Sequence, residues 1–209
     1  MKNLLYHLSF LTRCGICLML FSMFLTSCDS DDAPSQESLL PPITMTGENT
    51  FGCLIDGKFF KPRDGGSTIS TGNKGMSVLR TEEKNLEISV FDFKSDKRTS
   101  LFIHLENFYI NGEESYPLMQ ATGLRGLDGP NHNYVYCILW RDNDYEVFYS
   151  FENSGEFLIN KIDTTLTNKR IFAGEFDVIL NNIDRTDSIQ LSLGRFDIET
   201  QSLSSTTFD

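Results

Sequence analysis

Residues 134–151 read YVYCILWRDNDYEVFYSF, two runs of aromatic and β-branched residues that flank the polar tetrapeptide 141–144. Aromatic and β-branched side chains favour strands, whereas Asp and Asn favour turns. The segment therefore predicts a β-hairpin with a four-residue loop. This register gives four cross-strand pairs on one face: Trp140–Tyr145, Ile138–Val147, Tyr136–Tyr149 and Tyr134–Phe151.

The predicted hairpin has two apolar faces, and they compete for one core. The paired side chains above form the first face, and six of the eight are aromatic. The second face carries Val135, Cys137, Leu139, Glu146, Phe148 and Ser150. We expect the aromatic face to be the core. The alternatives are a central hairpin covered on both sides, or an exposed platform for sugar rings with four candidate binding residues: Trp140, Tyr136, Tyr145 and Tyr149.

Period-two patterns continue on both sides of this hairpin. Residues 50–61 (TFGCLIDGKFFK) place Asp56-Gly57, a favoured hairpin turn, between two apolar arms. Alternating runs follow at 86–91, 101–106, 155–162, 170–180 and 188–198. At most, residues 113–121 hold a turn of helix, and Pro117 disfavours it. The pattern predicts an all-β fold, an antiparallel β-sandwich or open barrel of about eight to ten strands.

The N-terminal residues have the features of an export signal. Lys2 and Arg13 precede a twelve-residue apolar run, CGICLMLFSMFL at 14–25, which is shorter than the roughly 20 residues of a spanning helix. The run ends in Leu-Thr-Ser-Cys at 25–28, the pattern of a bacterial lipobox. It predicts a lipoprotein signal peptide over 1–27 and lipidation of Cys28, with an uncleaved membrane anchor as the alternative.

The rest of the chain divides into a tether and one domain. Residues 28–46 are acidic and polar, with Pro41-Pro42 near their end, and we expect a lipidated Cys followed by a flexible tether. Residues 47–209 then form a single β domain. The chain has a net charge of −11, and removing residues 1–27, which hold two basic residues and no acidic one, makes it −13. This charge disfavours nucleic acid as a partner.

Two cysteines remain outside the leader and the lipidation site. Cys14 and Cys17 have CxxC spacing but belong to the predicted signal peptide. Cys53 and Cys137 are an even pair in an exported domain, and they are a disulfide candidate. The alternative is a pair of buried free thiols that pack as small apolar residues.

The sequence contains no pattern specific enough to name a reaction. Outside the leader its histidines are His104, in a strand pattern, and His132, in a loop pattern. We expect His104 to be structural. The acidic stretches 142–144 and 184–187 lack the ligand spacing of a calcium loop, and turn formation explains them better than calcium binding. We therefore expect no catalytic residue, no metal site and no cofactor, and a protein that is not an enzyme.

Two segments resemble a known family. Residues 49–58 (NTFGCLIDGK), preceded by Leu40-Pro41-Pro42, resemble the opening of an uncharacterised family of Bacteroidetes cell-envelope lipoproteins. Gly194-Arg195-Phe196-Asp197 and the Phe-Ala-Gly-Glu-Phe stretch at 172–176 resemble that family's closing strands. Asp56 and Phe60 stand where Asn and Trp are usual. The resemblance implies an exported lipoprotein with a β domain and implies no activity.

We therefore expect a protein anchored to the cell envelope that works by binding. Asp29, Asp31 and Asp32 resemble a surface-export signal, which favours the outer membrane and its outer face. The expected partners are the lipid bilayer, through acylated Cys28, and either a glycan or an envelope protein. A glycan-binding module using the aromatic hairpin face and a structural component of a surface complex are the two specific alternatives. A hydrolase has the least support.

The anchor gives the first prediction. Changing Cys28 to Ala removes the sulfur that would carry the lipid, so incorporation of a labelled fatty acid should be lost and the unprocessed precursor should accumulate. Radiolabelling and mobility on a denaturing gel measure both effects. A Cys28→Ala protein with mature mobility that still partitions into detergent would refute the lipoprotein assignment.

Overall fold

The computed structural model describes residues 34–66, 73–123, 132–141, 143–167 and 169–209. The predicted signal peptide and Cys28 lie outside these residues. No helix among the described residues is long and apolar enough to cross a membrane. Residues 35–209 form one packed unit, which is described below.

The described residues form an all-β fold, as predicted. They contain eleven strands, of which β2 and β6 are only three residues long, and every pair of neighbouring strands is antiparallel. The strands are β1 (Thr50–Ile55), β2 (Lys58–Phe60), β3 (Met76–Arg80), β4 (Leu86–Asp92), β5 (Thr99–Leu105), β6 (Ser115–Pro117), β7 (Tyr134–Arg141), β8 (Asp144–Tyr149), β9 (Gly155–Asp163), β10 (Ile171–Asn182) and β11 (Ser188–Glu199).

The helical elements that lie wholly among the described residues are three short segments. These are η2 (Gln36–Leu39), α2 (Phe108–Asn111) and η4 (Leu203–Ser205). The helical turn considered for 113–121 is not formed, because Ser115, Tyr116 and Pro117 pair with β9 as a strand. The Asp56-Gly57 turn is confirmed: both residues have positive φ, 49° and 76°, as a tight hairpin turn requires.

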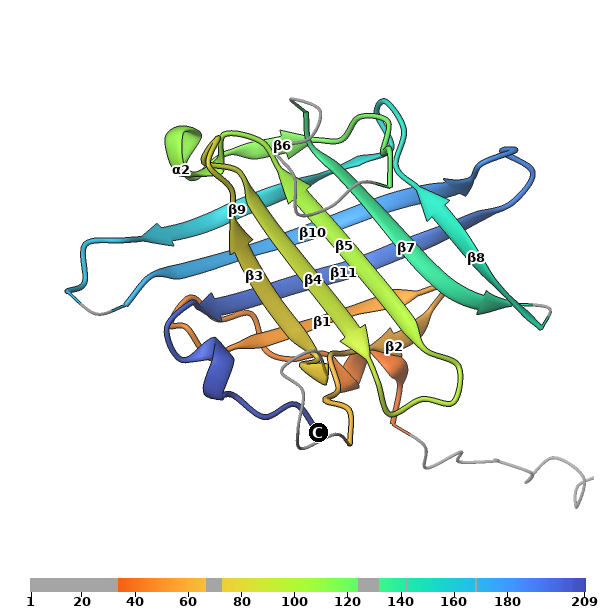
Figure 1. Ribbon diagram of the computed structural model, residues 1–209, viewed down its shortest axis with the longest axis horizontal. Coiled ribbons are helices and arrows are strands. Elements are labelled where there is room, and N and C mark those ends of the chain that lie inside the picture. The colour runs from red at the N-terminus through yellow and green to blue at the C-terminus, as the bar shows by residue number, and fades with distance from the viewer. Residues whose placement is uncertain (1–33, 67–72, 124–131, 142, 168) are drawn as a thin grey trace, which may run out of the picture. The chain divides into compact units, whose positions relative to one another are not determined.

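The sheet divides at β10. Residues 171–178 of β10 pair with β9, whereas Asn181 and Asn182 pair with Tyr149 and Phe148 of β8. Strand β11 runs along the other side of β10. The result is a front layer, β3-β4-β5-β7-β8, and a back layer, β6-β9-β10-β11-β1-β2, whose strands cross in Figure 1. Strand β10 thus belongs to the back layer and joins it to the front one.

A second connection joins the two layers at their opposite edge. Just after β2, the Arg63 N–H donates to Phe91 O (2.9 Å), and the Phe93 N–H donates to Arg63 O (3.0 Å). The Arg63 guanidinium also forms a two-pronged ion pair with Asp92, with Nε 2.7 Å from Oδ1. Because both edges are joined in this way, the sandwich is an incompletely closed barrel.

The hairpin at 134–151 has the predicted register and a tighter turn. Tyr136 pairs with Tyr149, Ile138 with Val147 and Trp140 with Tyr145. The ladder continues to Arg141 and Asp144, so the loop has two residues instead of four. The predicted Tyr134–Phe151 pair lies beyond the end of β8 and is not part of the ladder.

The hairpin face that packs into the core between the layers is the opposite of the predicted one. Val135, Cys137 and Phe148 are fully buried in the main hydrophobic cluster, together with Phe157 and Phe172 of the back layer. The aromatic face of the hairpin points the other way, because alternate residues of a strand lie on opposite faces. The core thus combines large rings from both layers with the smaller side chains of Val135 and Cys137.

The N-terminal boundary of the packed unit lies at Ser35, before the predicted domain start at residue 47. Asp197 holds this segment against β11: its buried carboxylate accepts hydrogen bonds from Thr44 Oγ1 (2.7 Å) and from the N–H groups of Thr46, Gly47 and Glu48 (2.8–3.2 Å). Residues 35–46, which the sequence assigned to the tether, are therefore part of the packed unit.

Cys53 and Cys137 enter the same core from β1 and β7. Both are fully buried free thiols, so the predicted disulfide is not formed in this structure. Burial raises the pKa of both thiols, and the nearby Cys53 and Asp56 raise the pKa of Cys137 further. The thiolate is the reactive form, so these groups are poorly disposed to oxidise in the folded protein.

The second prediction concerns these two thiols. Neither Cys53 nor Cys137 should react with an alkylating reagent in the native protein, because both are buried. Both should react after denaturation without reductant, and intact mass should show the two added groups. A peptide linking Cys53 to Cys137 in a non-reduced digest would establish the disulfide instead.

Candidate functional site

The aromatic side chains that the core excludes form a second cluster on the outer side of the front layer. We call this cluster the outer aromatic face; it consists of Phe91, Phe102, Ala121, Tyr134, Tyr136, Ile138, Val147 and Tyr149. Strand alternation explains it: β4, β5, β7 and β8 each present aromatic or β-branched residues at the positions between their core residues.

Ring contacts run across this face from strand to strand. Ring centroids are 5.4 Å apart for Phe91 and Phe102, 4.6 Å for Phe102 and Tyr136, and 6.2 Å for Tyr136 and Tyr149. Phe102 and Tyr136 are only 6% and 5% exposed, whereas Phe91 and Tyr149 at the ends of the row are half-buried. The middle of the face is therefore structural, and its ends are accessible.

A second pair of aromatic rings lies toward the hairpin turn. Trp140 and Tyr145 pack edge to face with ring centroids 4.8 Å apart. Tyr145 is 47% exposed and Trp140 is half-buried. Of the four predicted binding residues, the structure leaves Trp140, Tyr145 and Tyr149 accessible and buries Tyr136.

A hollow of about 320 Å³ adjoins the Tyr149 end of the face. It lies where the end of β8 meets the end of β10, which pair through Asn181 and Tyr149. We call it the amide hollow, and its lining residues are Gln120, Ala121, Thr122, Tyr149, Phe151, Asn181, Asn182, Ile183 and Arg185. Of these residues, only Tyr149 was a predicted binding residue. Residues 120–122 and 181–185 lie far from it in the sequence, so no local pattern links them to it.

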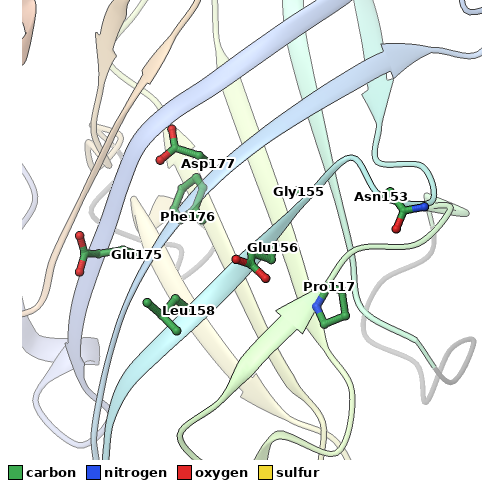
Figure 2. A pocket seen from close by; sticks show the side chains of 8 residues that line it. All are labelled: Pro117, Asn153, Gly155, Glu156, Leu158, Glu175, Phe176 and Asp177. Carbon is green, nitrogen blue, oxygen red and sulfur yellow. The ribbon is translucent and has the colours of Figure 1, made fainter.

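A larger hollow of about 590 Å³ lies against the back layer, over β9 and β10. Figure 2 shows its lining, which includes the carboxylates of Glu156, Glu175 and Asp177 and the side chain of Leu158. We call it the acidic hollow. Asp177 and Glu156 are directly opposite each other across β10 and β9, an arrangement of like charges that disfavours the pairing.

Each of these carboxylates already has a partner within the fold. Glu156 accepts a hydrogen bond from Ser115 Oγ, and Glu175 accepts one from Asn160 Nδ2 (2.8 Å). Asp177 accepts from the Leu193 N–H (2.9 Å). In the part of the chain that the structure describes, no group of three or more His, Cys, Asp or Glu side chains could hold a metal ion.

The two histidines occupy structural positions. His104 is 1% exposed; its Nδ1 is 3.1 Å from Glu87 Oε1, and its ring stacks on Tyr134 with centroids 4.6 Å apart. His132 Nε2 lies 2.8 Å from the carbonyl oxygen of Gln120. His104 is buried on the outer side of the sheet, away from both hollows.

The two acidic stretches considered for calcium differ in what the structure shows. Residue 142 lies outside the described residues. In the turn at 184–187, Asn182 Oδ1 accepts hydrogen bonds from the N–H groups of Thr186 (2.9 Å) and Asp187 (3.2 Å). Asp187 also pairs with Arg141 at 2.5 Å. These contacts are turn chemistry, in agreement with the favoured interpretation.

Comparison with known proteins assigns neither a family nor a function to the chain. No protein-family model matches the chain, and no curated protein or solved structure does so either. The resemblance to Bacteroidetes lipoproteins therefore stays a prediction.

The third prediction compares the two faces of β8. Phe148 is fully buried in the core, so Phe148→Ala should lower the free energy of unfolding by about 3–5 kcal/mol. Tyr145 is on the outer face and 47% exposed, so Tyr145→Ala should cost about 1 kcal/mol or less. Urea unfolding of the two variants measures both values. Equal losses would show that both faces of the hairpin are core.

Proposed function

We propose that this protein is a lipid-anchored binding module of the bacterial cell envelope, and that a glycan binds to its outer aromatic face together with the adjoining pair Trp140 and Tyr145. One observation carries the proposal: accessible aromatic rings lie on the solvent side of a sheet whose core is filled by other residues. The rings are Trp140 and Tyr145 near the hairpin turn and Tyr149 at the end of the strand row.

Aromatic rings suit a sugar for a physical reason. A pyranose ring has an apolar face of C–H groups and a rim of hydroxyls, so it can stack on an aromatic ring while its rim stays hydrated or hydrogen-bonded. Tyr145 and Tyr149 are four residues apart on one face of β8, which places them about 13–14 Å from each other along the strand. An oligosaccharide can span that separation, whereas one sugar unit cannot.

The anchor and charge support the same proposal from the sequence. A lipid on Cys28 would hold the domain at the membrane without a spanning helix. The net charge of −11 disfavours nucleic acid and anionic lipid headgroups as the ligand. The acidic hollow is not part of the proposed site, because each of its carboxylates accepts a hydrogen bond from a neighbour within the fold.

The fourth prediction tests glycan binding directly. The full-length protein, in micelles of a detergent without a sugar headgroup, should bind one or more oligosaccharides on a glycan array. Tyr145→Ala and Trp140→Ala should each weaken that binding by about tenfold, because each removes a stacking surface. Array intensity followed by calorimetric titration gives the affinities.

Glu156→Gln serves as the matched control, because it alters the larger hollow on the other layer and leaves the aromatic rings intact. Binding should be unchanged in this variant. Failure of the protein to bind any oligosaccharide, or equal binding by wild type and both aromatic variants, would contradict the proposal.

A further inference from the structure

The amide hollow contains polar groups that the fold does not use. Among the described residues, no side-chain hydrogen bond or ion pair engages Asn181 or Arg185. Gln120 donates from Nε2 to Ala121 O at 3.2 Å, and its Oε1 accepts no hydrogen bond from a described residue. Three neighbouring side chains thus offer donors and acceptors beside the ring of Tyr149.

Asn182, the next residue along the chain, shows the contrast. Its Nδ2 donates to Glu146 Oε1 (2.9 Å) and Thr186 Oγ1 (3.1 Å), and its Oδ1 accepts from two backbone N–H groups of the turn. Asn182 therefore builds the turn. Asn181 is half-buried at the end of β10 and lines the hollow, and its side chain forms no hydrogen bond with a described residue.

From this arrangement we infer that the amide hollow is the specificity subsite of the proposed glycan site, and that it takes one neutral sugar unit. The inference rests on the proposed function and adds the place and chemistry of recognition. Tyr149 supplies the stacking surface, and Asn181, Gln120 and Arg185 supply hydrogen bonds to the hydroxyl rim. Trp140 and Tyr145 then contact more distant units of the same chain.

The size of the hollow favours one sugar unit. Its volume of about 320 Å³ is at the low end of the roughly 300–1,000 Å³ of small-molecule sites. The hollow adjoins the outer aromatic face through Tyr149, so a longer glycan can continue from it onto the rings.

The charges around the hollow favour a neutral unit over a uronate. An amide offers both a donor and an acceptor, which matches a hydroxyl. Arg185 is the one cationic residue of the lining, and Asp184 precedes it in the same turn. The chain as a whole is acidic, with a net charge of −11, which opposes the approach of a polyanion.

The acidic hollow does not compete with this assignment. Although it is larger, its three carboxylates are each held by a hydrogen bond from Ser115, Asn160 or the backbone of Leu193. These carboxylates therefore have partners within the fold, unlike the side chains of Asn181 and Arg185 in the amide hollow.

The test uses the full-length protein in sugar-free detergent. The probes are neutral oligosaccharides built from glucose, mannose, galactose or xylose, together with oligogalacturonate as the charged comparison. Asn181→Ala should weaken the binding of the best neutral probe by about tenfold, as expected for lost hydrogen bonds in a binding site. Glu156→Gln should leave binding unchanged, and thermal melts should show that both variants are folded.

The outcomes separate this inference from the proposed function. Binding that is lost in Tyr145→Ala but unchanged in Asn181→Ala would overturn the subsite and leave glycan binding standing. Tighter binding of oligogalacturonate than of every neutral probe, abolished by Arg185→Ala, would overturn the neutral-sugar assignment. No binding to any probe would overturn the subsite and the proposed function together.

Discussion

The structure depends on one constraint: the hairpin at 134–151 has two apolar faces, and the space between the layers accommodates only one. Val135, Cys137 and Phe148 occupy that space, where they meet Phe157 and Phe172 of the back layer. The aromatic side chains of the other face are left on the solvent side. Neighbouring strands bury part of them, through contacts such as the 4.6 Å stacking of Tyr136 on Phe102. The remaining exposed rings are the basis of the proposed function.

Strand β10 determines where these rings meet polar groups. It pairs with β9 over 171–178 and then with β8 at Asn181 and Asn182, so the two layers join beside Tyr149. The opposite edge is joined by Arg63 and Asp92. Because the junction at β10 brings the 120–122 segment, the end of β8 and the 181–185 turn together, it creates the amide hollow. The proposed site is therefore a product of how the sheet divides.

The sequence predicted much of the fold and little of the site. Alternation and turn residues gave the hairpins at 50–61 and 134–151, because both signals are local. Strand β3 was missed: its five residues, MSVLR, are too few to establish an alternation. The choice between the hairpin faces was wrong because it depends on the rings that the back layer supplies, a long-range property. The sequence did not indicate Asn181 as a binding candidate, and it indicated the 184–187 stretch only for a turn or calcium. The hollow that these residues share with Tyr149 is likewise a long-range property.

Quenching of the fluorescence of Trp140, the single tryptophan of the chain, tests whether this side of the hairpin faces solvent. If Trp140 lies on the outer face, iodide should quench its fluorescence in the native protein, with the denatured protein as the fully accessible reference. The emission maximum of the native protein should also lie close to that of the denatured protein. Blue-shifted emission that iodide does not quench would place Trp140 in the core and contradict the account.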